Sequence, residues 1–174
     1  MGTENISVKM GYIGVGDEAT YNTLELMKEI VLSSQENFGI RQFVSQIISH
    51  VPAYDEMGEI ATIYNFIRSR TRFTKDPLSF ELLQTPDFII RQISSGIIPT
   101  VDCDDMAVLG ATFLSILGYP VHFKAISTNG DNEFSHVYAM VKVGCCYIPF
   151  DPASPIGRLG IEPHNIKKEY LEKI

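Results

Sequence analysis

Hydrophobic residues recur at helical spacing through the first half of the chain. Three segments carry apolar side chains at steps of three and four residues, the spacing typical of amphipathic helices. These segments lie within residues 20–38, around residues 43–48 and around residues 60–67. Their apolar positions are Leu24, Met27, Ile30, Val31, Phe43, Ile47, Ile48, Ile60, Ile63, Tyr64 and Ile67. The pattern therefore predicts three helices with buried faces.

The stretches around these helices lack helical periodicity. Residues 6–15 mix apolar and small side chains, which favours a strand or an ordered arm. Residues 73–86 contain two Xaa-Pro steps, at Asp76-Pro77 and Thr85-Pro86, and such steps are typical of loops. We therefore expect residues 1–95 to be mainly helical, with an extended segment at the start and a loop near the end.

A longer and more hydrophobic helix pattern begins after Pro99. Its apolar face is formed by Met106, Gly110, Phe113, Leu114 and Leu117. Asp102 is of the residue type that caps helix N-termini, while Gly118 stands where a glycine often ends a helix and Pro120 prevents its continuation. The pattern predicts a helix that begins at Cys103, with this thiol in its first turn.

Strand alternation follows this helix. Within 134–143, Phe134, His136, Tyr138 and Met140 share one face, and Val137, Ala139, Val141 and Val143 share the other. A second strand at 147–150 runs directly into Asp151. An antiparallel hairpin whose turn is centred between Val143 and Gly144 would place His136 opposite Asp151, close enough for the carboxylate to accept the imidazole N–H.

These predictions place a thiol, an imidazole and a carboxylate in the roles of nucleophile, base and orienting group. A helix N-terminus and a protonated His136 both favour the thiolate of Cys103, whereas Asp102, Asp104 and Asp105 oppose it. First-turn acids commonly project into solvent, where water screens them. We therefore expect the pKa of Cys103 to lie below its ordinary value and that of His136 above.

Three sequence blocks resemble the transglutaminase-like superfamily. They are DCDDMAVL through LGYPV for the cysteine helix, FSHVYAMV for the histidine strand and YIPFDPA for the aspartate strand, with a lead-in at DPLSFELLQTP like that of bacterial and phage-encoded members. The resemblance implies an α+β fold in which a papain/transglutaminase-like core packs the cysteine helix on an antiparallel sheet. It also implies a Cys103–His136–Asp151 triad that performs acyl transfer on amides. Asp102 departs from the small residue common before the cysteine, and the chain has no tryptophan.

The proposed chemistry requires no cofactor and no metal. The backbone N–H of Cys103 would provide one donor of an oxyanion hole, and Gln84 or Gln92 is a candidate for the second. The Asp-Cys-Asp-Asp run suggests a cation site, but consecutive helical carboxylates diverge around the axis, so capping acids are the favoured interpretation.

Composition excludes several classes of partner. The net charge of -7 disfavours binding to nucleic acid, and the apolar runs are too short to span a membrane. The start of the chain lacks a secretion signal, and three cysteines are too few for a disulfide scaffold, so we expect a cytoplasmic protein.

The adjacent Cys145 and Cys146 are expected on opposite faces of a strand, one buried and one partly so, with no assigned chemistry.

The sequence as a whole indicates a single domain over residues 1–174, with its catalytic core in residues 96–174. The hypothesis is a cysteine peptidase, amidase or transglutaminase-like enzyme that acts on a protein or peptide. The alternative is a non-catalytic peptide-binding or phage-assembly module on the same fold. The oligomeric state is left open.

Overall fold

The computed structural model describes residues 8–11, 16–75, 81–128 and 133–174. Its first half is mostly helical, with short strands at either end. In chain order the elements are β1 (Val8–Gly11), α1 (Asp17–Ser34), α2 (Phe38–Ile47), α3 (Glu56–Arg70), β2 (Arg72–Phe73), β3 (Glu81–Gln84) and α4 (Pro86–Ser94).

The second half contains one long helix and all four strands of the main sheet. Its elements are β4 (Thr100–Val101), α5 (Cys103–Ile116), β5 (Val121–Ser127), β6 (His136–Val143), β7 (Cys146–Phe150) and β8 (Lys168–Lys173). The strand order of the sheet is β7-β6-β5-β8, and its neighbouring strands are antiparallel. The fold is α+β, as expected from the sequence.

The three predicted helices in the first half are confirmed as α1, α2 and α3. The apolar positions predicted for α1 and α3 are all buried: Leu24, Met27, Ile30, Val31, Ile60, Ile63, Tyr64 and Ile67. The expected loop over 73–86 is wrong in part, because residues 81–84 form β3, which pairs with β1. Residues 76–80 of that loop, and most of the expected arm at 6–15, lie outside the described residues.

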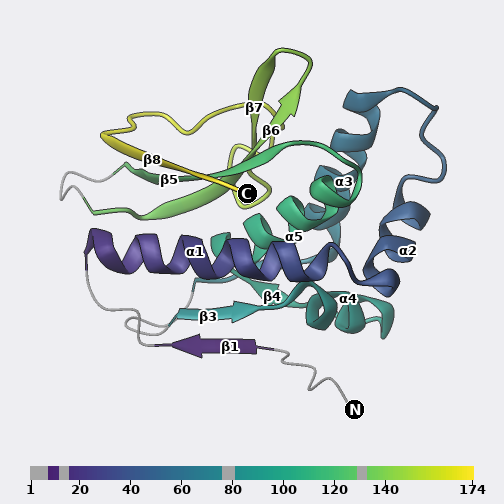
Figure 1. The fold of residues 1–174 in the computed structure, drawn as a ribbon, viewed down its shortest axis with the longest axis horizontal. Helices are drawn as coiled ribbons and strands as arrows, with labels where there is room; N and C mark the ends of the chain where they lie inside the picture. The colour runs from purple at the N-terminus through teal and green to yellow at the C-terminus, as the bar shows by residue number, and fades with distance from the viewer. Residues whose placement is uncertain (1–7, 12–15, 76–80, 129–132) are drawn as a thin grey trace.

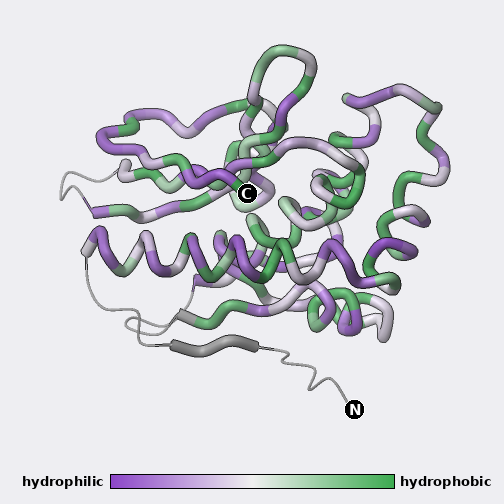
Figure 2. Tube along the Cα trace, in the orientation of Figure 1, coloured by the Kyte–Doolittle hydropathy of each residue, from purple (hydrophilic) through white to green (hydrophobic). Residues whose placement is uncertain are grey.

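Helix α5 forms the centre of the molecule. It lies between the four-stranded sheet and the helices α1 and α3 (Figure 1), and every residue from Asp105 to Leu114 is buried. Figure 2 shows hydrophobic residues gathered along α5. The helix is therefore enclosed by protein along most of its length, which fixes its position and that of its N-terminus.

The predicted ends of α5 are both confirmed. Asp102 accepts a hydrogen bond from the backbone N–H of Asp105 at 3.0 Å, which caps the N-terminus. Gly118 has a φ of 89°, and the N–H of Tyr119 donates to the carbonyl of Leu114 at 3.1 Å. This glycine-dependent C-terminal motif ends the helix and starts the chain toward β5.

The sheet packs one face of β5 and β6 on α5. Phe123, Ala125, Val137, Ala139 and Val141 belong to the core on this side, together with Phe150 at the end of β7. The other face of β6 carries His136, Tyr138 and Met140, so the predicted alternation along this strand is confirmed. No helix in the described part of the chain is both long enough and apolar enough to cross a lipid bilayer.

Candidate active site

Cys103 is the first residue of α5, as predicted, and its side chain is half-buried. A first-turn residue has a backbone N–H without a partner inside the helix, and the helix dipole is positive at this end. The thiol donates a hydrogen bond to Asp104 Oδ1 at 3.3 Å. In this structure Cys103 is therefore hydrogen-bonded as a protonated thiol to a neighbouring carboxylate.

His136 and Asp151 form a direct side-chain contact. His136 Nε2 lies 2.7 Å from Asp151 Oδ2, and the Asp151 side chain is 1% exposed, against 21% for His136. The burial of the carboxylate excludes competing water, so a single strong hydrogen bond orients the imidazole.

The predicted hairpin register is wrong, but His136 and Asp151 are in contact as that register predicted. Val143 pairs with Cys146, so the two-residue turn is Gly144-Cys145 rather than Val143-Gly144. The shift amounts to two positions on the partner strand, which keeps every side chain on its predicted face. Asp151 follows the end of β7 and reaches His136 diagonally, within the range of cross-strand neighbours.

Asp151 is itself held by contacts that the sequence did not reveal. The backbone N–H of Ala153 donates to Asp151 Oδ1 at 3.1 Å, and the hydroxyl of Tyr64 donates to the Asp151 carbonyl at 3.2 Å. Arg68 Nη1 donates to the carbonyls of Pro152 and Ser154, both at 2.8 Å. Helix α3 thus fixes the turn that presents the carboxylate, through residues more than 80 positions away in the chain.

A backbone hydrogen bond connects Cys103 with the histidine strand. The Val137 N–H donates to the Cys103 sulfur, which places the thiol beside the residue that follows His136. Because Nε2 of His136 is occupied by Asp151, Nδ1 is the ring nitrogen left to exchange a proton with a thiol. Among the described residues, no hydrogen bond is formed by Nδ1.

The expected low pKa of Cys103 is wrong. Burial raises the pKa of this thiol well above its ordinary value, Asp104 and then Asp102 raise it further, and the Val137 N–H lowers it. The expectation failed because it assumed that the acids beside Cys103 point into water. Instead, Asp104 lies within hydrogen-bonding distance of the sulfur and Asp102 is 8% exposed.

Asp105 is also buried rather than solvated, with 2% of its surface exposed. Its two oxygens accept hydrogen bonds from Gln84, one from the backbone N–H and one from Nε2, each at 2.7 Å. Burial and the nearby Asp102 raise the pKa of Asp105 to about 8, against the lowering effect of the Gln84 hydrogen bonds. This contact ties β3 to the first turn of α5.

The same geometry removes Gln84 as a candidate oxyanion donor. Gln84 Nε2 also donates to the carbonyl of Thr100 at 2.9 Å, so both of its amide protons are engaged. Gln92 lies in α4, and the described contacts include no side-chain hydrogen bond from it to the Cys103 helix. Only the Cys103 N–H remains as an identified donor.

A charged network around the buried Lys124 lies next to the imidazole. Tyr138 packs against His136 with ring centroids 5.7 Å apart, and its hydroxyl donates to Glu162 Oε1 at 2.8 Å. Lys124 forms ion pairs with Glu162 at 2.6 Å and with Glu169 at 2.8 Å. These contacts hold the segment that follows Asp151 against the sheet face that carries His136.

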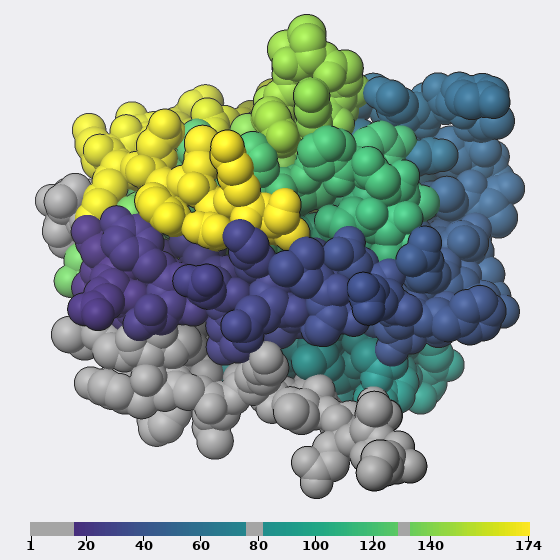
Figure 3. All heavy atoms as spheres, in the orientation of Figure 1, coloured from purple at the N-terminus to yellow at the C-terminus, as the bar shows by residue number. Residues whose placement is uncertain are grey.

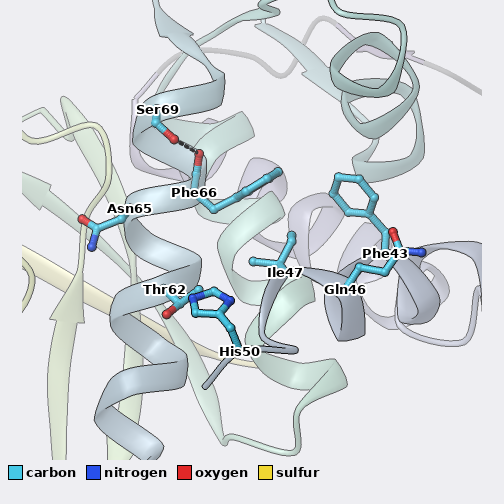
Figure 4. A pocket seen from close by; sticks show the side chains of 8 residues that line it. All are labelled: Phe43, Gln46, Ile47, His50, Thr62, Asn65, Phe66 and Ser69. Atoms are coloured by element: carbon cyan, nitrogen blue, oxygen red, sulfur yellow. Dashed lines mark hydrogen bonds between the residues drawn. The ribbon is translucent and has the colours of Figure 1, made fainter. Parts of the chain in front are cut away.

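A groove on the helical side of the molecule lies apart from the candidate active site. Figure 4 shows a groove between α2 and α3 that is lined by Phe43, Ile47, His50 and Phe66 among others. None of Cys103, His136 and Asp151 lines this groove. In the part of the chain that the structure describes, no group of three or more His, Cys, Asp or Glu side chains is arranged to hold a metal ion.

The expectation for Cys145 and Cys146 is wrong. Both residues are exposed, and their sulfurs lie 3.4 Å apart. Adjacent residues in a strand point to opposite faces, but Cys145 occupies the hairpin turn and only Cys146 belongs to β7. The turn brings the two side chains to the same side.

Comparison with known proteins finds similarity in structure only. No protein-family model and no curated protein matches the sequence. A putative protease from Parabacteroides distasonis superposes with a TM-score of 0.59 at 13% identity, over 89% of this chain and 32% of that one. A putative cysteine protease from Cytophaga hutchinsonii superposes with a TM-score of 0.50 at 12% identity, over 77% and 50%. The chain therefore spans half or less of either structure and shares their fold.

Proposed function

We propose that this protein is a thiol-dependent acyl-transfer enzyme of the papain and transglutaminase-like superfamily, acting on peptide or carboxamide bonds. Cys103 is the nucleophile, His136 the general base and Asp151 the residue that orients the imidazole. The observation that carries the proposal is the 2.7 Å contact between His136 and the buried Asp151, on a strand whose next backbone N–H reaches the Cys103 sulfur. The fold shared with two structures named as proteases agrees with it.

The first half-reaction forms a thioester. As the Cys103 sulfur attacks the carbonyl carbon, its proton passes to His136 Nδ1, and Asp151 stabilises the resulting imidazolium. The carbonyl oxygen becomes an oxyanion that the Cys103 backbone N–H can stabilise at the positive end of α5. The imidazolium then protonates the leaving nitrogen, the carbon–nitrogen bond breaks, and an amine or ammonia departs.

The second half-reaction regenerates the thiol. Water or an acceptor amine gives a proton to Nδ1 and attacks the thioester, and the proton returns to the sulfur as it leaves. Because the resting thiol has a raised pKa and is bound to Asp104, transfer to the imidazole has to accompany attack. His136 therefore has to accept the thiol proton during each turnover, because Cys103 does not start as a thiolate paired with an imidazolium.

Turnover and its acceptor can be tested together. The chain is incubated with an unfolded protein substrate, with and without a fluorescent primary amine, and the products are analysed by mass spectrometry. New peptide termini indicate hydrolysis, a gain of one mass unit at glutamine indicates deamidation, and amine incorporation indicates crosslinking chemistry. Cys103→Ala should abolish all three products, whereas a Cys145→Ser/Cys146→Ser double variant should retain them. Activity that survives in Cys103→Ala would refute the assignment.

One observation favours the alternative, a non-catalytic peptide-binding or assembly module. A nucleophile with a raised pKa is poorly ionised near neutral pH, and a binding protein would tolerate this without cost. Single-turnover experiments separate the two functions. An enzyme forms a thioester on Cys103 with an activated acyl substrate, whereas a binding module retains the peptide unchanged and binds it equally well as Cys103→Ala.

A further inference from the structure

The turn between β6 and β7 presents two sulfur atoms on one side of the chain. Gly144, with a φ of 57°, is the first residue of the two-residue turn and Cys145 is the second. Among the described residues, Tyr54 and Asn165 are the only non-glycine residues with positive φ, so Cys145 has an ordinary negative φ. Glycine at the first position followed by a residue of negative φ is typical of a type II′ hairpin turn. The turn therefore holds the two sulfurs 3.4 Å apart without backbone strain.

Both thiols are open to solvent. Cys145 and Cys146 are exposed, as are the neighbouring Lys142, Gly144 and Tyr147. The hairpin stands out from the body of the molecule, as its projection at the top of Figure 3 shows. A reagent can approach the two sulfurs together without displacing any part of the core.

The distance between the sulfurs suits a shared bond to a third atom better than a bond to each other. A disulfide normally needs its Cα atoms about 4.4–6.8 Å apart. Consecutive residues have theirs at about 3.8 Å, so a Cys145–Cys146 disulfide would be strained. We propose that Cys145 and Cys146 form a vicinal dithiol site that chelates a soft, thiophilic centre with two open valences, such as a monosubstituted trivalent arsenical.

The distance between the two sulfurs favours such a centre over zinc. If each sulfur bonds one atom at about 2.3 Å, a 3.4 Å separation gives an angle of about 95° at that atom. This angle matches a pyramidal trivalent centre and is narrower than the tetrahedral angle at zinc. Structural zinc also needs four ligands, and no group of three or more metal-binding side chains occurs among the described residues.

Chelation is balanced without a redox step. With phenylarsine oxide, each thiol loses its proton as an arsenic–sulfur bond forms, and the oxide oxygen leaves as water with both protons. The arsenic remains trivalent throughout. Two bonds to one reagent give the pair an advantage over a single thiol, because the second bond forms within the complex.

This site lies apart from the proposed catalytic cysteine. Val143, at the end of β6 beside the turn, is seven strand positions from His136, which at about 3.3 Å each is roughly 23 Å. The inference therefore does not depend on the proposed enzymatic activity. Loading the dithiol should leave Cys103 free.

The test uses the full-length reduced chain titrated with phenylarsine oxide, with intact-mass analysis and a count of remaining alkylatable thiols. We expect one adduct per chain, the loss of two thiols, and release by 2,3-dimercaptopropanol but not by 2-mercaptoethanol. Cys145→Ser and Cys146→Ser should each weaken binding by 100-fold or more, while Cys103→Ser should bind as the wild type does. Insertion of a glycine between Cys145 and Cys146 should also weaken it, because it separates the sulfurs.

Three results would overturn the proposal. One is an adduct that depends on Cys103. Another is full affinity in either single variant of the pair. The third is a reduced wild-type chain in which Cys145 and Cys146 are both alkylatable but which takes up no arsenical.

Discussion

At the scale of single residues, the two oxygens of Asp151 have separate partners, and this makes its replacement by asparagine informative. Oδ1 accepts from the Ala153 N–H, and Oδ2 faces His136 Nε2. In Asp151→Asn the amide oxygen keeps the backbone contact, so the amide nitrogen is directed at Nε2. An N–H donor there requires Nε2 to be an acceptor, which places the ring proton on Nδ1 and blocks proton transfer from Cys103.

We therefore expect Asp151→Asn to lower kcat by a factor on the order of 10⁴, the magnitude known for the corresponding change in a serine protease triad, without loss of the fold. Steady-state kinetics and far-UV circular dichroism would measure both effects. Unchanged kcat would show that another group orients His136.

Asp104 should be the acid that most strongly restrains the reactivity of Cys103. It accepts the thiol hydrogen bond and is the largest cause of the raised pKa after burial. Asp104→Asn removes one negative charge, so the pKa of Cys103 should fall and alkylation near neutral pH should accelerate several-fold. The rate of iodoacetamide labelling at Cys103, followed by peptide mass spectrometry against pH, measures this, with Cys145 and Cys146 replaced by serine in all proteins.

A matched control for this substitution is Asp87→Asn, which removes an acid paired with Arg91 on the surface of α4. It should leave the pH profile of Cys103 unchanged. If Asp104→Asn and Asp87→Asn give the same profile, charge beside the thiol does not determine its ionisation, and burial alone does.

The local sequence predicted where the cap and the thiol of this site lie, but not the charges that surround the thiol. Asp102 as a cap and Cys103 as the first residue of a helix follow from local rules, because capping is decided within one turn. The burial of Asp105 depends on Gln84, 21 residues earlier in the chain. The sequence around Asp105 carries no sign of that contact, so its effect on the charge near the thiol could not be foreseen.

At the scale of elements, α3 acts on the site through Arg68. Its guanidinium holds the carbonyls of Pro152 and Ser154, which lie in the turn after Asp151. Arg68→Ala should leave the Pro152 carbonyl without its donor and the Ser154 carbonyl with only the Gly157 N–H, and this should loosen the carboxylate. We expect a reduced kcat with little change in KM, because substrate contacts are untouched, and a loss of about 1.5–3 kcal/mol in unfolding free energy.

Arg70→Ala provides the matched control for Arg68. It removes a second arginine from the same helical turn, and Arg70 is exposed. Kinetics and urea unfolding of both variants separate positioning from a general charge effect. Equal losses in the two variants would contradict a specific role for Arg68.

The packing of α5 on β7 depends on the absence of a side chain at Gly110. A Cβ there would lie 2.5 Å from Phe150 Cε1, and Phe150 is fully buried against the ring of Tyr64. Alanine gains about 1 kcal/mol of helix propensity over glycine, but overpacking a core commonly costs about 1–3 kcal/mol. We expect Gly110→Ala to destabilise the fold by up to about 2 kcal/mol net.

Because Phe150 immediately precedes Asp151, Gly110→Ala should also lower kcat. Ala111→Gly is a suitable comparison, since it alters the same helix and core without adding an atom. It should destabilise the chain yet leave kcat nearly unchanged. Wild-type activity in Gly110→Ala would show that Phe150 can move without displacing Asp151.

Periodicity predicted which faces are buried more reliably than it predicted pairing. The alternation in β6 correctly grouped Val137, Ala139 and Val141 on one face, because a strand has a fixed period of two, and the structure shows that this face belongs to the core. The register with β7 depended on which two residues form the turn. Val143-Gly144 and Gly144-Cys145 both contain the glycine that such a turn needs, so sequence alone did not distinguish them.

At the scale of the whole molecule, the non-local contacts explain what the sequence could not predict. Helix α5 touches the sheet and α1 to α4, and its N-terminus meets β3 through Asp105 and Gln84. Cys103 thus stands on an element whose position is determined by residues from both halves of the chain. Stability and the geometry of the candidate site should accordingly respond together to changes at Asp105.

The pKa of Asp105 links this contact to the stability of the entire fold. It is about 8 in the folded chain and near 3.8 when the residue is solvated, so between these values the folded state holds a proton that the unfolded state has released. The unfolding free energy should therefore fall as pH rises across this window, by up to about 1.4 kcal/mol per pH unit, and stop falling above pH 8. His122 has a lowered pKa and acts in the opposite sense, since it favours unfolding as pH falls through its ordinary value.

Urea unfolding at pH 5, 6, 7, 8 and 9 tests this dependence in the wild type and in Asp105→Asn. The variant has no titrating group at this position, so it should lose the decline between pH 5 and 8 whatever its absolute stability. The difference between the two curves cancels the contribution of His122, which both proteins share. The same decline in both curves would mean that Asp105 is already ionised in the folded state, with its charge held by the two hydrogen bonds from Gln84. In that case the first turn of α5 would carry a permanent negative charge beside Cys103, and the His136 base would have to work against it in every turnover.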